Sequence, residues 1–504
     1  MASRLKTILL LAGFLIPAVI FAVNGVAASP PKQDPEFVFV VTTTEDHNDG
    51  SCDADCSLRD AIIAANKTEF HDTILLPSGT YTLTLEGSGE DDGLTGDLDI
   101  TSALTIVGYG AETTIIDAGG LTGRPDRVFD MHADYVDPFE VGLSALTITG
   151  GRAWGGQGGG IKIRNAEVDL DHSSVRANSA EWGGGIYTYG GPVQLVDCTI
   201  SENTAYTGGG LHLNQVTTAE LNHTSIIGNV APGSGGGIYS VGADSLDLKH
   251  CTVSANHAGE GGGISSVRSV ATLLQSTISG NYAEYGGGIY HLGGSLYVDQ
   301  SSINGNTAEF EGGGIFYFIC GIPDDVRLLD STISGNSAGT SGGGIYNHDC
   351  RLYLYNSTIS ENSAPNGGGI HNWEYTWLKN TIVAINAIGG DCYDLGGGLL
   401  SNGHNLDSDG TCNLTTEGDL PNTDPRLGPL QDNGGPTFTH ALLFGSPAMD
   451  AGDNSACPGT DQRGFTRPMD GDGDGTATCD IGAFEHLGLR GRFPLALSNY
   501  GPSP

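Results

Sequence analysis

One repeat, copied nine times at a spacing of 25 to 30 residues, is the feature that most restricts the fold of this 504-residue chain. Each copy has a run of glycines followed by an aliphatic residue, and then an asparagine with a hydrophobic residue three positions before it. The aliphatic residues are Ile161, Ile186, Leu211, Ile238, Ile264, Ile289, Ile315, Ile345 and Ile370. The asparagines are Asn178, Asn203, Asn229, Asn256, Asn281, Asn306, Asn336, Asn362 and Asn386. Two ladders that share one period indicate an architecture of stacked units.

The repeat contains three short apolar stretches, for example at residues 184–186, 193–195 and 198–200. Each stretch is too short for an ordinary helix, and its alternation suits a strand with one buried face. One unit alone cannot bury that face, but a second unit stacked about 4.8 Å away completes a core. The repeat therefore predicts an all-β fold, a right-handed parallel β-helix with three strands per coil. A propeller fits less well because its blades need about 40 residues. The asparagines are expected to form a stacked turn ladder that bonds to the adjacent coil.

The chain is expected to begin with an export signal. Arg4 and Lys6 precede an uncharged apolar stretch, and small residues then end at Ala28. An uncleaved membrane anchor is the alternative, although the apolar stretch falls short of the roughly 20 residues that a span requires. The predicted division is a signal peptide (1–28), a linker (29–36), an amino-terminal cap with irregular coils (37–150), regular repeats (151–400), a loop-rich carboxyl-terminal module (401–485) and a tail (486–504).

The amino-terminal cap is predicted to be a helix near residues 56–66. Ser57 and Asp60 have the spacing of a capping box, and Leu58, Ile62 and Ala65 share one helical face. Such a helix would close the open end of the β-helix core.

Ten cysteines in an exported chain favour disulfides over metal-thiolate sites, and no CxxC motif is present. Proximity along the chain suggests the pairs Cys52 with Cys56, Cys320 with Cys350, Cys392 with Cys412, and Cys457 with Cys479. Cys198 and Cys251 occupy the same position in repeats that are two coils apart, too far for a bond. They are expected to be buried free thiols.

The charge balance restricts the partners of this protein. Asp and Glu total 59 against 21 Lys and Arg, a net charge of −38, which argues against nucleic acid or anionic lipid. An acidic segment suggests Ca²⁺ as a candidate ion instead. Asp470, Asp472 and Asp474 alternate as at the start of an EF-hand loop, but the twelfth position is not the usual Glu. A partial site that includes Asp480 is one hypothesis, and a solvated acidic turn is the other.

Aromatic residues directly follow many of the repeat aliphatics and would point outward if the aliphatics point inward. The candidate ligand-binding row consists of Tyr187, Tyr239, Tyr290, Phe316 and Tyr346. Exposed rings one coil apart could stack on sugar rings. The alternative, which the pattern favours, is that the rings pack on one another or are covered by loops.

Three motifs resemble known families. The CSLRDAI segment at residues 56–62 resembles the CSLREA signature of bacterial secreted β-helix proteins, with Asp60 in place of Glu. Residues 424–485 resemble the choice-of-anchor Q domain found at their carboxyl ends. The GGGI and Ile-x-x-Asn repeats resemble the GGAI and FxxN repeats of chlamydial polymorphic outer-membrane proteins, with Ile or Val in place of Phe. The resemblance implies a secreted or cell-surface protein, often of the outer membrane and adhesin-like.

The sequence thus favours a non-catalytic surface protein that binds polysaccharide or a cell-surface glycan. A polysaccharide lyase or glycoside hydrolase acting on acidic polysaccharide is the first alternative. Its candidate basic groups are Lys162, Arg164, Arg124 and Arg127, which match no specific catalytic pattern. A structural spacer of the cell envelope is the second alternative. The sequence alone assigns no catalytic residue and leaves the oligomeric state open.

Overall fold

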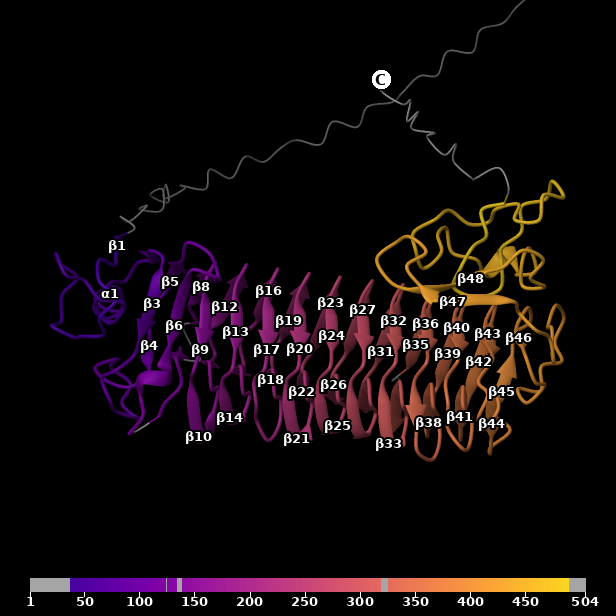
Figure 1. Ribbon diagram of the computed structural model, residues 1–504, viewed down its shortest axis with the longest axis horizontal. Helices are drawn as coiled ribbons and strands as arrows, with labels where there is room; N and C mark the ends of the chain where they lie inside the picture. The colour runs from indigo at the N-terminus through magenta and orange to yellow at the C-terminus, as the bar shows by residue number, and fades with distance from the viewer. Residues whose placement is uncertain (1–36, 124, 134–137, 319–324, 489–504) are drawn as a thin grey trace, which may run out of the picture. The chain divides into compact units, whose positions relative to one another are not determined.

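The computed structural model describes residues 37–123, 125–133, 138–318 and 325–488. The predicted signal peptide and linker, Arg124, Cys320 and the tail from residue 489 lie outside the described residues. The described chain winds into a parallel β-helix in which each sheet runs the length of the stack (Figure 1).

Three long parallel sheets form the walls of the described coils. Sheet I contains β4 (Leu98–Ile100), β7 (Phe129–His132), β11 (Ile161–Arg164), β15 (Ile186–Tyr189), β18 (Leu211–Asn214), β22 (Ile238–Val241), β26 (Ile264–Val267), β30 (Ile289–Leu292), β34 (Ile315–Phe318), β38 (Ile345–His348), β41 (Ile370–Asn372) and β44 (Cys392–Asp394). Sheet II contains β1 (Val38–Val40), β2 (Asp72–Leu75), β5 (Leu104–Val107), β8 (Glu140–Ser144), β12 (Glu167–Asp171), β16 (Val193–Val196), β19 (Thr218–Asn222), β23 (Ser245–Lys249), β27 (Ala271–Leu274), β31 (Leu296–Asp299), β35 (Val326–Leu329), β39 (Leu352–Tyr355), β42 (Thr376–Lys379) and β45 (Leu399–Ser401). Sheet III contains β3 (Gly79–Thr82), β6 (Thr114–Asp117), β9 (Thr147–Thr149), β13 (Ser174–Arg176), β17 (Thr199–Ser201), β20 (Ser225–Ile227), β24 (Thr252–Ser254), β28 (Thr277–Ser279), β32 (Ser302–Asn304), β36 (Thr332–Ser334), β40 (Thr358–Ser360), β43 (Ile382–Ala384) and β46 (Leu406–Asp407).

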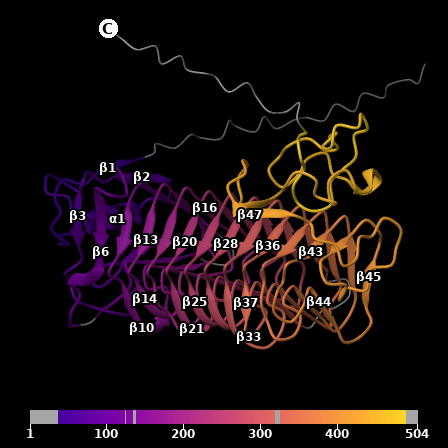
Figure 2. The ribbon, with the colours of Figure 1, turned by 45° about the vertical axis from the view of Figure 1, so that its right-hand side comes forward.

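A fourth set of short strands, which the three-stranded repeat did not predict, lies between sheet III and the glycine run of the next coil. We call it sheet IV, and it comprises β10 (Arg152–Gln157), β14 (Ser179–Trp182), β21 (Val230–Ser234), β25 (His257–Glu260), β29 (Tyr282–Tyr285), β33 (Thr307–Glu311) and β37 (Ser337–Ala338). Its strands are visible below sheet I in Figure 1 and along the lower edge in Figure 2. The segment after six of the nine ladder asparagines is therefore an extended strand rather than a simple turn.

The nine repeat aliphatics lie directly opposite one another on neighbouring strands of sheet I, from Ile161 to Ile370. They are at most 1% exposed and belong to one continuous core. Stacking supplies the burial that a single coil lacks, since each strand of a coil pairs with the coils before and after it. The prediction of an all-β parallel β-helix is confirmed.

The asparagines form a continuous hydrogen-bonded ladder inside the corner between sheets III and IV. At Asn203, the side-chain Nδ2 donates to the Val175 carbonyl of the preceding coil at 2.9 Å, and the backbone N–H donates to Asn229 Oδ1 at 3.0 Å. The same pattern repeats to Asn362, whose N–H donates to Asn386 Oδ1. The ladder ends where Asn386 Nδ2 donates to Asp391 Oδ1 at 2.9 Å. Satisfying buried polar groups in this way fixes the stacking register.

A second ladder occupies the position five residues before each asparagine. Its members are Ser173, Cys198, Thr224, Cys251, Ser276, Ser301, Ser331, Ser357 and Thr381. Thr224 Oγ1 donates to the Leu195 carbonyl of the preceding coil at 3.3 Å, and the Cys198 thiol lies 3.4 Å from the Leu170 carbonyl. Cys198 and Cys251 are free and buried, as expected, and burial raises the pKa of each thiol to about 11.

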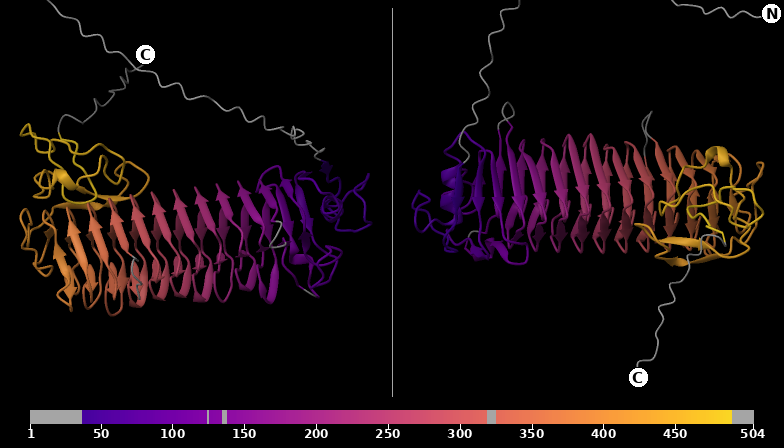
Figure 3. Two further views of the ribbon diagram at one scale, coloured as in Figure 1. Left: turned by 180° about the vertical axis from the view of Figure 1, so that it is seen from behind. Right: turned by 90° about the horizontal axis from the view of Figure 1, so that it is seen from above.

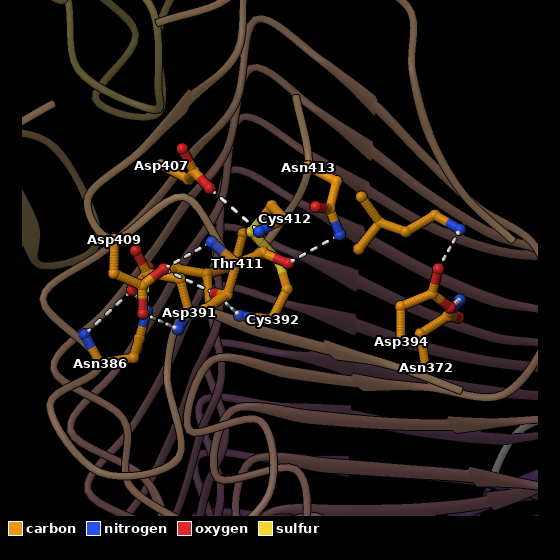
Figure 4. Close-up of a disulfide and its surroundings, with 12 residues drawn as sticks. Asn372, Asn386, Asp391, Cys392, Asp394, Asp407, Asp409, Thr411, Cys412 and Asn413 are labelled. Atoms are coloured by element: carbon orange, nitrogen blue, oxygen red, sulfur yellow. Dashed lines mark hydrogen bonds between the residues drawn. A yellow bond between two sulfur atoms is a disulfide. The ribbon is translucent and has the colours of Figure 1, made fainter. Parts of the chain in front are cut away.

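Each end of the described stack is closed differently. At the amino end, α1 (Leu58–Ala65) buries Leu58, Ile62 and Ala65 in the core, and its Ser57–Asp60 capping box is formed. At the carboxyl end, the Cys392–Cys412 disulfide ties a loop across the last coil, where Asp391 N–H donates to Asp409 and Cys412 N–H donates to Asp407 (Figure 4). The Cys52–Cys56 and Cys457–Cys479 disulfides are also formed. Cys350 is disulfide-bonded, but the predicted partner Cys320 lies outside the described residues.

The loop-rich carboxyl-terminal part folds back onto the flank of the last coils, over sheet III (Figure 3). It includes the antiparallel hairpin β47 (Leu427–Gln431) and β48 (Thr439–Leu442). Gln462 holds it to the stack through Thr332 Oγ1, which donates to Gln462 Oε1 at 2.6 Å. The Gly482 carbonyl accepts from the buried Arg467, which lies 3.5 Å from Asp330. Within the described residues, none of the helices is of a length and apolarity that would allow it to span a membrane.

Candidate functional site

The predicted ligand-binding row is present in sheet I, but it is not an open surface. Tyr187 is 4% exposed, Tyr290 9% and Phe316 8%, while Tyr239 and Tyr346 are half-buried. The Phe316 ring stacks between those of Tyr290 and Tyr346 at 5.1 Å on both sides, with planes 2° and 3° apart. The spacing of parallel strands is close to that of stacked rings, so the aromatics satisfy one another.

Sheet IV supplies the remaining cover of this row. The Tyr285 ring of β29 meets the Phe316 ring edge-on at 5.9 Å, and the glycine turn between the sheets brings Gly312 against the Phe316 side chain. The rings therefore pack on one another and are covered, which is the alternative that the sequence pattern favoured, and the candidate row of exposed ligand-binding aromatics is corrected. The sequence repeat did not reveal that a fourth strand supplies part of the cover.

The same row continues into the irregular coils, where its chemistry changes. Asp99 of β4, Asp130 of β7 and Lys162 of β11 lie opposite one another on adjacent strands. Lys162 Nζ is 2.6 Å from Asp130 Oδ2. Arg127 Nη1 is 3.1 Å from the same oxygen and 2.7 Å from Asp97 Oδ2. All three carboxylates are at most 2% exposed, so this is a buried ionic cluster.

The surroundings shift the pKa values of the carboxyl groups of this cluster in opposite directions. Burial raises the pKa of Asp97 to about 7 and that of Asp99 to about 8. Burial also raises the pKa of Asp126. Burial alone would raise the pKa of Asp130 too, but His132, Arg127 and Lys162 outweigh it and bring the pKa to about 2. Strong and opposed shifts of this kind concentrate at functional sites.

The basic groups considered for a lyase do not form a free base. Lys162 and Arg127 are both in ion pairs with buried carboxylates. Arg164 lies opposite His132 in the next coil. A proton-abstracting base must reach the substrate within hydrogen-bond distance, whereas the Lys162 amine is engaged by Asp130 at 2.6 Å.

Exposed aromatics gather instead on the first strands of sheet IV. Trp154 of β10 is 80% exposed, Tyr206 is 60% exposed, and Trp182 of β14 is 36% exposed. Trp154 and Tyr206 border one cavity of about 500 Å³ together with Glu181. Trp154 also borders a second cavity of about 520 Å³ lined by Arg127, Asp130 and Lys162. We call these aromatics, with Glu181, the tryptophan platform.

The platform has a sequence signal that the repeat alignment passed over. Trp154 and Trp182 stand immediately before glycine runs, and Tyr206 stands two residues before the next one. Tyr206 N–H donates to the Glu181 carbonyl at 2.9 Å, which fixes the order Trp154, Glu181, Tyr206 on successive coils. The backbone segments that carry the two exposed rings are then two coils apart, about 9–10 Å at the strand spacing of a sheet.

The acidic segment near residue 470 assembles only in part. Carboxylate oxygens of Asp470, Asp472 and Asp450 lie within 4.8 Å of one another. Asp474 and Asp480 are not in that group, and Asp480 is buried, with Oδ1 accepting the Asp450 N–H at 2.7 Å. The two oxygens of Asp470 accept N–H groups of Gly473 and Gly475, as in an ordinary acidic turn. The four-residue Ca²⁺ set is therefore not brought together, and a calcium site here stays a prediction.

Family models match two parts of the chain. Residues 141–277 match the model of the right handed beta helix region, and residues 330–348 match the repeat of the Chlamydia polymorphic membrane protein. The comparison with curated proteins gives no match.

Among solved structures, pectate lyase Pel9A is similar over 90% of this chain and 96% of its own, with 12% identity and a TM-score of 0.36. That similarity carries no argument about activity. By fold and repeat, the chain is a right-handed parallel β-helix with a repeat like that of chlamydial polymorphic membrane proteins.

Proposed function

We propose that this protein is a secreted or cell-surface binding protein of the adhesin type, and that the tryptophan platform holds a polysaccharide or cell-surface glycan. The observation that carries the proposal is the solvent exposure of Trp154 and Tyr206 beside an open cavity of about 500 Å³. Large aromatic faces left in water on a rigid sheet mark interaction sites. Sugars offer apolar ring faces with polar rims, which such a platform suits.

Charge favours a neutral glycan over an acidic one. The chain carries a net charge of −38, Glu181 lies on the platform, and Glu90 and Asp91 line the adjoining cavity. A polyanion would approach against this field. The platform therefore fits a neutral sugar chain that runs along the coil axis.

Three features support a location outside the cell. The three described disulfides suit an oxidising compartment. Residues 330–348 match a repeat that is described for a membrane protein, the Chlamydia polymorphic membrane protein. The predicted signal peptide and the likeness of residues 56–62 and 424–485 to CSLREA and choice-of-anchor Q segments agree with export.

A glycan array probed with the full chain, followed by titration of the best ligand, tests the proposal. Trp154→Ala and Tyr206→Ala should each weaken binding about tenfold, the value of one aromatic stacking contact. Phe444→Ala is the matched control because Phe444 is 82% exposed but lies in the carboxyl-terminal part. Its binding should equal that of the wild type.

Failure of the wild-type chain to bind any glycan would contradict the proposal and favour a structural spacer. Equal binding by Trp154→Ala and wild type would place the site elsewhere. Release of new reducing or unsaturated ends from the ligand would replace binding by an enzymatic function.

A further inference from the structure

We propose that Asp99, Asp130 and His132 form a binding site for a divalent cation of the Zn²⁺ class. The inference does not rest on the glycan-binding function. It rests on how three side chains of two adjacent strands converge, and on what their atoms lack.

The backbone brings the three side chains to one place. Asp99 of β4 and Asp130 of β7 are direct partners across the parallel pair. Asp130 and His132 are two residues apart on β7, so both point to its outer face. One ligand atom from each lies within 4.8 Å of the other two, and His132 Nδ1 is 3.8 Å from Asp130 Oδ1. With metal–ligand bonds of about 2.0–2.2 Å, two ligands of one ion can lie up to about 4.4 Å apart.

Each of the three converging residues has one buried side-chain atom without a hydrogen-bond partner. These atoms are Oδ1 of Asp99, Oδ1 of Asp130 and Nδ1 of His132. Asp99 is 1% exposed and Asp130 is 2% exposed. Leaving a buried polar atom unpaired is costly, and one such atom on each of three converging residues indicates a missing partner. A metal ion would satisfy all three.

The second oxygen of each carboxylate is anchored, which orients the first. Asp99 Oδ2 accepts the Gly93 N–H at 2.9 Å. Asp130 Oδ2 is held by Lys162 at 2.6 Å and by Arg127 at 3.1 Å. Outer contacts that fix ligand orientation are a regular feature of metal sites.

The charge of the cluster leaves room for a dication. Four buried carboxyl groups, those of Asp97, Asp99, Asp126 and Asp130, lie in this cluster. Arg127 and Lys162 form ion pairs with three of them, Asp97, Asp126 and Asp130. Among the described residues Asp99 has no ion-pair partner, and a bound dication would supply the countercharge that its ionised form needs in this buried place. An imidazole nitrogen among carboxylate oxygens favours Zn²⁺ over Ca²⁺, which prefers an all-oxygen set.

The other carboxylate clusters of the described residues differ from this one. Asp171, His172 and Asp197 also come within 4.8 Å of one another. They are at the surface, and His172 Nδ1 already pairs with Asp171 at 2.6 Å. That cluster has the same residue types without buried, unpartnered atoms, and it provides a matched control.

The test uses the full chain stripped with a chelator and titrated with zinc chloride by calorimetry and by thermal melting. The wild type should bind one equivalent more tightly than His132→Gln by at least about tenfold, and its melting temperature should rise with zinc. Asp99→Asn should lose the same binding step. His172→Gln should retain it. Calcium chloride at equal concentration should give a smaller shift than zinc.

His132→Gln replaces a half-buried side chain, so folding of that variant is expected and can be verified by a cooperative melt. Equal zinc affinity in wild type and His132→Gln would overturn the proposal, as would the absence of zinc binding by the stripped wild type. Loss of zinc binding in His172→Gln alone would move the site to the surface cluster. Stronger stabilisation by calcium than by zinc would overturn the assigned class of ion. Glycan binding is measured separately through Trp154, so the two proposals can fail independently.

Discussion

The outward-facing row of sheet I carries aromatic residues in one region and charged residues in another, at equivalent positions of the strands. In the regular coils, Tyr290, Phe316 and Tyr346 stack ring on ring. In the first coils, the same row carries Asp99, Asp130 and Lys162. Rings at the strand spacing attract one another, whereas like charges at that spacing repel and need countercharges. The same backbone positions thus stabilise the fold where they carry stacked aromatic rings. Where they carry carboxylates, they form a candidate binding site.

The largest effect is expected from Arg127→Met in the ionic region. The change leaves Asp97 without its 2.7 Å partner and removes one of the two cations on Asp130. Breaking a buried ion pair from one side should lower the free energy of unfolding by about 3–5 kcal/mol, measured by urea denaturation. The exposed Arg268 supplies the control, since Arg268→Met should change stability by no more than about 0.5 kcal/mol. Similar losses in both variants would remove the distinction between the regions.

The next effect is expected in the stacked region. Phe316→Ala empties a buried place between two parallel rings. The cavity should lower the free energy of unfolding by about 3 kcal/mol, by the same urea assay. Glycan binding should be unchanged, because the ring is 8% exposed. Loss of glycan binding without loss of stability would restore the row as a ligand surface.

A pH effect is expected from His212, the buried histidine of the row that lies between Tyr187 and Tyr239. Burial lowers the pKa of His212 to about 4, against 6.5 for an ordinary histidine. The unfolded chain binds a proton below about pH 6.5 and the folded chain only below about pH 4. Stability from this group is therefore complete above pH 6.5 and is lost as the pH falls toward 4, by up to about 3 kcal/mol.

Comparison of wild type with His212→Phe across that window measures this contribution. The difference in unfolding free energy should shift in favour of the variant as the pH falls from 6.5 to 4. A constant difference at every pH would show that folding does not lower the pKa of His212 and would contradict this prediction.

The smallest effect on stability is expected at the platform. Trp154→Ala should change the free energy of unfolding by no more than about 0.5 kcal/mol, because the ring is 80% exposed. The same substitution should weaken glycan binding about tenfold. A thermal melt and a binding titration on one preparation measure both. A destabilisation equal to that of Phe316→Ala would make Trp154 a structural residue.

Sequence reasoning reached the fold because the repeat leaves little choice. The nine aliphatics can be buried and the nine asparagines hydrogen-bonded only if the coils stack in register. The capping-box spacing of Ser57 and Asp60 predicted the capping helix. The free state of Cys198 and Cys251 followed from their equal positions two coils apart.

The candidate sites depended on features that the repeat does not encode. Sheet IV covers the aromatic row, and strands such as Ser179–Trp182 have too little apolar alternation to predict. Asp99, Asp130 and Lys162 belong to coils of 31 and 32 residues, outside the regular period, so their alignment emerges only from the strand pairing. The sequence spacing could not show that Asp480 lies apart from the other proposed calcium ligands. Asp480 is buried through hydrogen bonds from the backbone N–H groups of Asp450 and His486.

The most direct test of the account is a crystal structure of the full chain with the oligosaccharide that binds best on the array. Sugar rings are expected against Trp154 and Tyr206, along the first strands of sheet IV. Sugar seated on the sheet I row from Tyr187 to Tyr346, or on the carboxyl-terminal part near Phe444, would contradict it.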